Sequence, residues 1–349
     1  MRRGVTVTAL VTALVLAASS CGTGGDGGAD GGSGEPSGTV TFWDVSNETE
    51  KKVFRAIAEA FERRHPDVDV EYVSVPFGDA QNKFKNAAGA GGSGAPDVIR
   101  TEVAWTADFA HLGYLAPLDG TRAVHDQRDY LPQAWASTQY EGRTYAVPQV
   151  IDTLALFYNK RLLRQAGVDV PHSLAQLRRS ARAIRERTDA APLYLRGDDP
   201  YWFLPYLYGE GGDLLDTRAR KITVDDPAGV RALRVIRDLV QDRVAITDST
   251  EGWENMQRAF KNGEVAMTVN GPWGIADSLS GAEFKDDPDN LGVAPVPAGS
   301  RAQGSPQGGW NLAVYAGSDN LAASYEFVRY LSSPEVQRRT AEQLSLLPT

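Results

Sequence analysis

Cysteine is nearly absent from this 349-residue chain, because Cys21 is its single cysteine. No intramolecular disulfide can therefore stabilise the fold. Long apolar runs are also lacking: the stretch from Val5 to Ala18 is too short to span a bilayer, and no other segment approaches about 18 consecutive apolar residues. Basic residues are outnumbered, with 36 Lys and Arg against 45 Asp and Glu and a formal net charge of -9. This balance excludes a nucleic-acid partner, which requires a basic face.

The chain also lacks the common motifs of nucleotide-dependent and hydrolytic enzymes. Neither the phosphate-binding pattern G-x-x-x-x-G-K-[ST] nor the nucleophile pattern G-x-S-x-G occurs. Two strings match G-x-G-x-x-G, starting at Gly22 and Gly89, but neither follows a strand and opens a helix, as a dinucleotide site requires. The four histidines are scattered without the spacing of metal ligands. We therefore predict no cofactor, no metal site and no catalytic residues.

The N-terminus has the features of an export signal. Arg2 and Arg3 are followed by the apolar stretch and then by small residues before Cys21. We predict a signal peptide over residues 1–20, cleavage before Cys21, and a diacylglycerol attached to the sulfur; the alternative is a stray thiol within a leader. Residues 22–38 contain nine glycines and no apolar cluster, which predicts a flexible tether. Lipidated Cys21 and this tether, residues 21–38, would hold an extracytoplasmic protein at the outer face of the cell membrane.

From residue 39 onward, segments with strand and helix periodicity alternate. Residues 39–43 predict a buried strand, and the 3.6-residue spacing of Val53, Phe54, Ile57 and Phe61 predicts the helix that follows. Further strands are predicted at 68–75, 96–99, 153–158, 264–270, 291–296 and 310–316, and further helices at 173–188, 227–242 and from 321 and 334. Such alternation is typical of α/β proteins with largely parallel sheets.

The residues best suited to bind a ligand are aromatic and acidic. Tryptophans lie at positions 43, 105, 135, 202, 253, 273 and 310. Trp43 ends a predicted strand, while Trp273 and Trp310 directly follow glycine-containing turns. Ligands bind at the carboxyl ends of strands in α/β sheets, and sugars combine flat C–H faces with hydroxyls that need charged acceptors. Tryptophan beside acidic residues therefore suggests carbohydrate binding, although core packing is the alternative for each ring taken singly.

Several motifs, taken in order, carry a family resemblance. The chain resembles the maltose/trehalose branch of the family 1 extracellular solute-binding proteins, and the resemblance covers nearly everything from residue 39 to residue 349. The motifs that carry it are Val40–Trp43, Pro96–Ile99 continuing to Glu102–Phe109, Tyr145–Pro148 before Leu156–Lys160, Phe260–Met267 running on to Gly271–Trp273, and Gly308–Leu312.

The resemblance implies an α/β fold with two lobes, a hinge of crossing strands and an interlobe sugar cleft. Lobe 1 would comprise residues 39–150 and 291–349, and lobe 2 residues 151–290. The implied partners are a sugar such as maltose, maltodextrin or trehalose and the transmembrane subunits of an ABC importer, with the receptor itself a monomer. The positions that match family ligand residues are Asn47, Glu48, Glu102, Asp152, Trp273, Gly309 and Trp310, followed by Trp43, Trp105 and Trp253, which could equally form wall or core.

One departure from the family pattern concerns the C-terminus. Members usually continue for some dozens of residues beyond the position that matches Leu347–Thr349, and those helices complete the second lobe. We therefore expect a lobe 2 without its closing helices. Two other functions stay open: a receptor for a non-sugar solute such as glycerol phosphate, and a glycosidase that uses Glu102 and Asp152 as acid and nucleophile.

Overall fold

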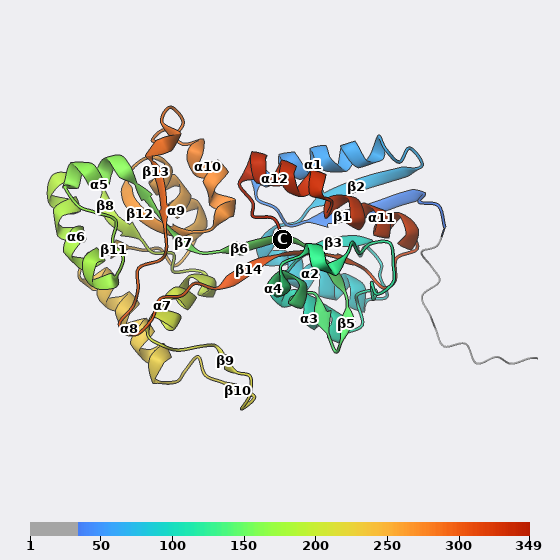
Figure 1. The fold of residues 1–349 in the computed structure, drawn as a ribbon, viewed down its shortest axis with the longest axis horizontal. Coiled ribbons are helices and arrows are strands. Elements are labelled where there is room, and N and C mark those ends of the chain that lie inside the picture. Colours follow the sequence, from blue (N-terminus) through green and yellow to red (C-terminus); the bar gives the residue numbers. More distant parts are fainter. Residues whose placement is uncertain (1–33) are drawn as a thin grey trace, which may run out of the picture.

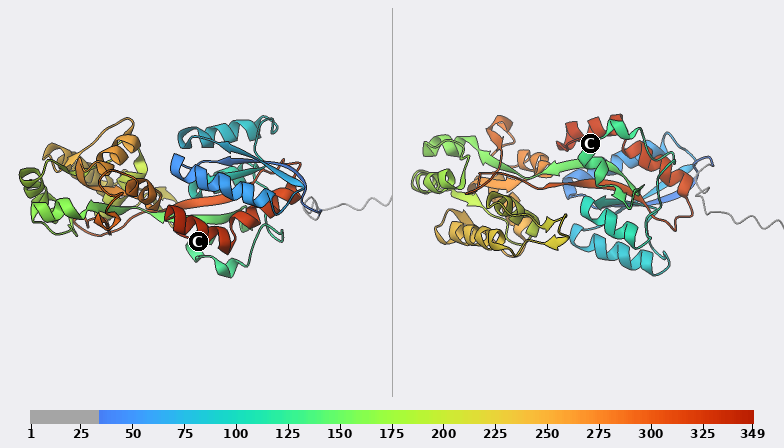
Figure 2. Two further views of the ribbon diagram at one scale, coloured as in Figure 1. Left: turned by 90° about the horizontal axis from the view of Figure 1, so that it is seen from above. Right: turned by 60° about the horizontal axis from the view of Figure 1, so that its bottom comes forward.

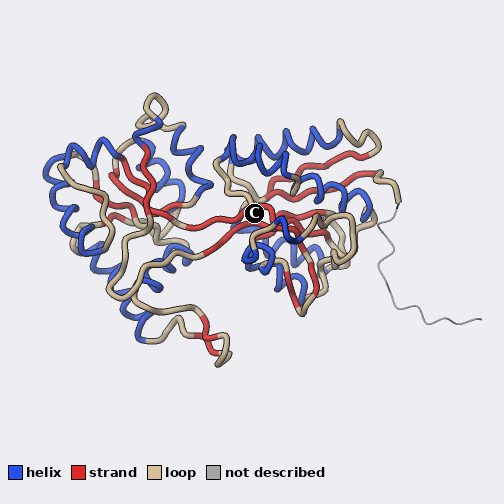
Figure 3. Tube along the Cα trace, viewed as in Figure 1, coloured by secondary structure: helices blue, strands red, loops and turns tan. Residues whose placement is uncertain are grey.

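The computed structural model describes residues 34–349, which form two lobes joined by two long strands (Figure 1). Each lobe is built on one five-stranded sheet within this part of the chain. Figure 3 shows the connecting strands running from one lobe to the other, and Figure 2 shows the same arrangement from two further directions. The predicted signal peptide, the predicted lipidation site at Cys21 and most of the predicted tether lie outside the described residues.

The sheet of lobe 1 has the order β2-β1-β3-β14-β6, with β1 parallel to β2 and β3, and β14 antiparallel to its neighbours β3 and β6. Its strands are β1 (Gly38–Asp44), β2 (Val68–Ser74), β3 (Val98–Glu102), β6 (Ala146–Thr153) and β14 (Gln307–Val314). The helices and a small hairpin of this lobe are α1 (Glu48–Glu62), α2 (Phe77–Gly89), α3 (Val103–His111), α4 (Pro132–Ala136), α11 (Leu321–Leu331), α12 (Pro334–Leu344), β4 (Gln139–Tyr140) and β5 (Arg143–Thr144).

The sheet of lobe 2 has the order β11-β8-β12-β7-β13. Its strands are β7 (Ala155–Asn159), β8 (Ala191–Tyr194), β11 (Ala245–Ile246), β12 (Val265–Asn270) and β13 (Leu291–Ala294). The helices are α5 (Lys160–Ala166), α6 (Leu174–Arg187), α7 (Leu204–Gly209), α8 (Pro227–Gln241), α9 (Gly252–Lys261) and α10 (Ile275–Leu279). A hairpin of β9 (Leu215–Asp216) and β10 (Lys221–Ile222) extends from the lower edge of this lobe in Figure 1.

The amphipathic pattern of the sequence explains the core of lobe 1. In α1, the predicted residues Phe54, Ile57 and Phe61 are fully buried, and the Asn47 side chain caps the helix by accepting from the backbone N–H groups of Thr49 and Glu50. This cap lowers the free-energy cost of starting a helix directly after a strand, because it satisfies two backbone N–H groups. The start of α1 is therefore set by the local sequence.

One predicted lobe boundary is wrong. Residues 291–349 were assigned to lobe 1, but β13 pairs with β7 in the sheet of lobe 2, and Val296 is buried in the core of that lobe. The chain therefore returns to lobe 1 only along β14. A four-residue apolar strand fits the edge of either sheet. Its pairing with β7 depends on residues that are far away in the sequence, so local periodicity does not predict it.

The two crossing strands pair with each other between the lobes. β6 and β14 form an antiparallel ladder from Gln307 opposite Thr153 to Ala313 opposite Ala146. Gly309 has φ +142°, and an added Cβ there would clash with the carbonyl oxygen of Val150. Glycine at this position thus permits close approach of the two strands.

Residues 34–349 contain no helix that is both long enough and apolar enough to cross a membrane.

Candidate functional site

Two carboxyl groups lie on one face of the lobe 1 sheet, on either side of β14. Asp152, on β6, is opposite Gly308, and Glu102, at the end of β3, is opposite Trp310. Positions 308 and 310 of β14 face the same side of the sheet, because side chains alternate along a strand. Gly308 carries no side chain, and an added Cβ there would clash with Asp152 Oδ1. The glycine therefore lets the Asp152 carboxyl and the Tyr201 hydroxyl lie directly over β14.

Lobe 2 contacts Asp152 through Tyr201. This tyrosine lies in a short 3₁₀ helix, Pro200–Phe203, and its hydroxyl donates to Asp152 Oδ1 at 3.4 Å. Asp152 is 6% exposed, so its carboxyl has little access to water. Burial and the neighbouring Asp152 raise the pKa of Tyr201, which keeps the phenol protonated and able to donate. The contact links the crossing strand β6 to a loop of lobe 2.

The two carboxyl groups are electrostatically unusual. Burial raises the pKa of Asp152 to about 7, with a further contribution from Glu102 and an opposing one from Arg100. Burial also raises the pKa of Glu102 to about 7, against the hydrogen bonds that its side chain accepts from the backbone at the start of α3, including Ala104 N at 2.9 Å. Hydroxyl donors of a ligand would stabilise both carboxyl groups, because they would replace the hydrogen bonds to water that burial removes.

Aromatic rings line lobe 1 beside Glu102. Phe77 stacks on Trp105 with centroids 5.5 Å apart, and Trp310 meets both rings edge-on at 6.0 and 6.1 Å. Phe77, at the start of α2, is 51% exposed although it is apolar. We call Phe77, Trp105 and Trp310 the aromatic wall. Such a wall offers flat π-faces next to a carboxyl group.

Trp273 contacts both lobes. It lies in the 3₁₀ helix Pro272–Gly274 of lobe 2, packs against the cores of both lobes, and its carbonyl accepts a hydrogen bond from Asn47 Nδ2 of lobe 1 at 3.5 Å. Its ring centroid is 6.5 Å from that of Tyr201. Asn47, Trp273 and Tyr201 therefore bring the two lobes together near Asp152.

The structure separates the predicted site residues into two groups. Asn47, Glu102, Asp152, Trp105, Trp273, Gly309 and Trp310 lie along or beside the crossing strands. Three other predicted residues make different contacts. Glu48 is exposed at the start of α1 and pairs with Lys51 at 3.2 Å. Trp43 is buried in the lobe 1 core, and Trp253 packs on the lobe 2 core with Arg196 5.8 Å from its ring centroid.

Sequence reasoning missed three residues of this region: Phe77, Arg100 and Tyr201. Phe77 begins an unpredicted helix whose Ala80, Phe84 and Ala88 are buried, a spacing that is visible in the sequence. Arg100 interrupts an apolar strand and is fully buried. The sequence signal for Arg100 is a single basic residue within a mostly apolar strand. No local sequence pattern indicates that Tyr201 contacts Asp152 on β6.

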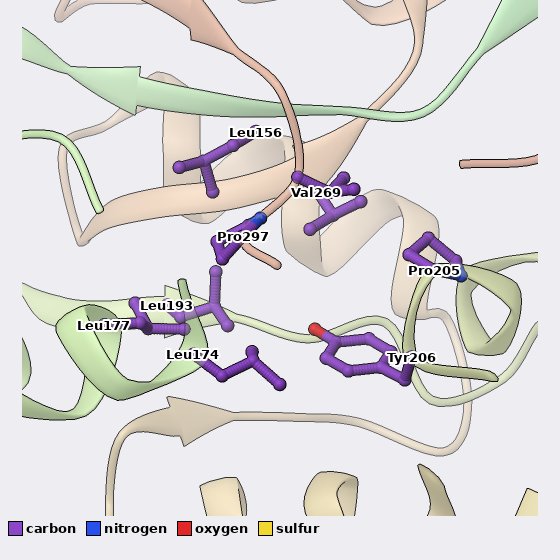
Figure 4. A pocket seen from close by; sticks show the side chains of 9 residues that line it. Leu156, Leu174, Leu177, Leu193, Pro205, Tyr206, Val269 and Pro297 are labelled. Atoms are coloured by element: carbon purple, nitrogen blue, oxygen red, sulfur yellow. The ribbon is translucent and has the colours of Figure 1, made fainter. Parts of the chain in front are cut away.

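An apolar cavity lies inside lobe 2, away from these carboxyl groups (Figure 4). Eight leucine, valine and proline residues line it together with Tyr206, from α6, α7 and the sheet. Figure 4 shows the Tyr206 hydroxyl directed toward this space. The lining lacks the charged acceptors that a polyhydroxylated ligand needs, so the cavity does not compete with the interlobe residues as a saccharide site.

The raised pKa values predict a specific pH dependence of stability. A carboxyl whose pKa is higher in the folded state contributes stability that is complete below about pH 4 and is lost as the pH rises through about 7. We expect Asp152→Asn to reduce this loss between about pH 4 and 7, as measured by urea denaturation of the ligand-free protein. Glu48→Gln, at an exposed position, is the matched control. An unchanged pH profile in Asp152→Asn would contradict the buried, proton-binding state of Asp152.

A family model described as bacterial extracellular solute-binding protein matches residues 46–338. The chain belongs to this family. The family resemblance inferred from the sequence motifs is thereby confirmed.

Solved structures of similar proteins confirm the two-lobed fold. The GacH receptor of Streptomyces glaucescens GLA.O, described unliganded and in complex with acarbose and an acarbose homolog, is 70% identical with a TM-score of 0.88, over 90% of this solute-binding protein and 80% of that chain. Maltose-bound T. maritima MalE3 is 27% identical with a TM-score of 0.81, over 89% of this chain and 81% of that chain.

Two further relatives are similar in sequence over most of this chain. The maltotriose-binding protein of Pyrococcus abyssi is 26% identical over 318 residues, which are 89% of this chain but 66% of that protein. The diacetylchitobiose binding protein DasA of Streptomyces coelicolor is 24% identical, over 90% of this chain and 74% of that protein.

Proposed function

We propose that this protein captures a gluco-oligosaccharide between its lobes and delivers it to an ABC importer. The observation that carries the proposal is the pair Glu102 and Asp152, which lie on either side of β14 beside the aromatic wall. Sugar hydroxyls would donate to the two carboxylates, and the sugar C–H faces would lie on the rings. The ligand would be α-linked, with maltose or maltodextrin first and trehalose second.

The named ligands of similar proteins support a saccharide. They include acarbose for the GacH receptor, maltose for MalE3 and maltotriose for the Pyrococcus abyssi protein. The crossing strands supply a hinge, and a ligand that contacts both lobes would shift the population toward a closed form. Closure would present one surface to the importer's transmembrane subunits.

We propose that the protein binds its saccharide without hydrolysing it and has no enzymatic activity. The family model that matches the chain is described as a solute-binding protein, and the similar Pyrococcus abyssi and Streptomyces coelicolor proteins are named as binding proteins.

Native mass spectrometry with saccharides tests binding and turnover together. We expect a mass increase equal to one intact gluco-oligosaccharide, with no shorter product after prolonged incubation. Maltose, maltotetraose, trehalose and acarbose form the panel, with glycerol 3-phosphate as the non-sugar competitor. Binding of glycerol 3-phosphate alone, or release of glucose, would contradict the proposed function.

We also propose that the protein is a lipoprotein held at the outer face of the cell membrane by Cys21, which lies outside the described residues. The apolar leader, the small residues and the glycine-rich tether support this proposal. We expect Cys21→Ala to move most of the protein from the membrane fraction to the medium, as measured by immunoblotting. A Ser20→Ala variant should stay anchored. Retention of Cys21→Ala in the membrane fraction would contradict lipid attachment at Cys21.

A further inference from the structure

Arg100 is fully buried and hydrogen-bonded from several elements. It lies on β3 two residues before Glu102, so both side chains face the same side of the sheet. Its Nε donates to Gln149 Oε1 of β6 at 2.8 Å. Its Nη1 donates to Ser46 Oγ at 2.9 Å and to Glu50 Oε2 of α1 at 3.1 Å. These contacts fix the plane of the guanidinium group.

The fixed guanidinium lies over the ring of Trp310. The distance from Arg100 Cζ to the Trp310 ring centroid is 4.4 Å, and that to the Phe54 ring is 4.9 Å. Phe77 and Trp105 meet Trp310 edge-on, so contacts from two other directions also restrain the indole. A cation stacked on a desolvated tryptophan is an attractive arrangement. One face of the indole is thus occupied by the guanidinium group.

Packing alone does not account for this arginine. A buried ion pair is costly, and replacing both of its partners with apolar side chains of similar volume commonly leaves a core as stable or more stable. Moreover, Arg100 Nη2 is buried and has no hydrogen-bond partner within residues 34–349. Buried groups of this kind are uncommon in native proteins and call for a functional explanation. The charge of Arg100 also lowers the pKa of Asp152, so the same side chain influences both the ring and the acid.

We propose that Arg100 is a positioning residue of the saccharide site, which holds the indole of Trp310 in the orientation that stacks on the ligand without itself contacting the ligand. The inference rests on the proposed saccharide-binding function. It assigns the orientation of Trp310 to a buried charged group that is held by hydrogen bonds to Ser46, Glu50 and Gln149.

A double-mutant cycle on saccharide affinity tests this role. Arg100→Lys keeps the charge but loses the planar fork and the stacking face. We expect it to weaken binding of the tightest saccharide of the panel by about tenfold in the wild-type background. In the Trp310→Ala background, the same change should weaken binding by less than about twofold, because residues that act through each other are not additive. Calorimetric titration measures all four proteins.

A milder variant keeps the test decisive if Arg100→Lys does not fold. Ser46→Ala removes one anchor of the guanidinium and should weaken binding by about threefold with Trp310 present and have no measurable effect without it. Ser332→Ala, which removes a hydroxyl bonded to Val328 O in α11, is the control with unchanged affinity. Equal losses in both backgrounds would overturn the positioning role alone. Failure of the wild type to bind any saccharide would overturn the proposed function and, with it, this inference.

Discussion

Replacing Arg100 with methionine is expected to lower the free energy of unfolding by about 3–5 kcal/mol. The guanidinium lies 3.1 Å from Glu50 Oε2 and 3.8 Å from Asp44 Oδ1, and both acids are buried. Removing the cation leaves these carboxyl groups in a low-dielectric interior without compensation. Urea denaturation at pH 7, followed by circular dichroism, measures the loss. The loss should become smaller as the pH is lowered, because burial raises the pKa of Glu50 and protonation removes its charge.

An exposed arginine provides the comparison. Arg64 pairs with Glu335 at 2.7 Å on the surface, and both side chains are about half exposed. Arg64→Met should therefore cost less than about 1 kcal/mol. Adding Glu50→Gln to Arg100→Met should recover part of the lost stability, since it removes one of the uncompensated charges. If Arg100→Met and Arg64→Met were equally stable, the buried network around β3 would be contradicted.

Replacing Asp152 with alanine is expected to reduce affinity for a gluco-oligosaccharide by about tenfold to hundredfold. The loss corresponds to about 1.5–3 kcal/mol for a hydrogen bond to a charged acceptor. Asp152 is the acidic residue of β6, and Tyr201 of lobe 2 already contacts it. In the Asp152→Ala variant, a saccharide bound beside β6 would therefore lose its hydrogen-bond acceptor on that crossing strand. Isothermal titration calorimetry of both proteins with the same saccharide measures the difference.

Glu48 provides the matched control for Asp152. The family resemblance predicts both residues as ligand positions, but 86% of the Glu48 side chain is exposed and it pairs with Lys51. Glu48→Ala should bind the saccharide as tightly as the wild type does. A loss at Glu48 equal to that at Asp152, or no loss at Asp152, would show that the site lies elsewhere between the lobes.

The order of strands and helices was largely predictable, because periodicity is a local signal. The structure buries the predicted helix face of Phe54, Ile57 and Phe61, and the strand before it was predicted within one residue at each end. The partner of β13 was not predictable in this way. Residues 291–294 are apolar and extended in either sheet, and their pairing with β7 depends on the tertiary structure.

The candidate site was predictable only where family motifs mark it. The motifs predict Glu102, Asp152 and Trp310, and the structure places them along neighbouring strands. Glu48 and Glu50 show the limit of the sequence signal. They are two positions apart in α1, and only the direction of each side chain separates the exposed Glu48 from Glu50, which pairs with Arg100. Such directions follow from how the helix docks on the sheet.

Calorimetric titration of the wild-type protein with maltotetraose tests the central claim most directly. The account predicts one bound saccharide per chain, with a negative heat-capacity change from the burial of sugar faces on the aromatic wall. It also predicts competition by acarbose for the same site. No heat of binding with any saccharide of the panel at millimolar concentration, in a protein whose cooperative unfolding shows that it is folded, would contradict the account.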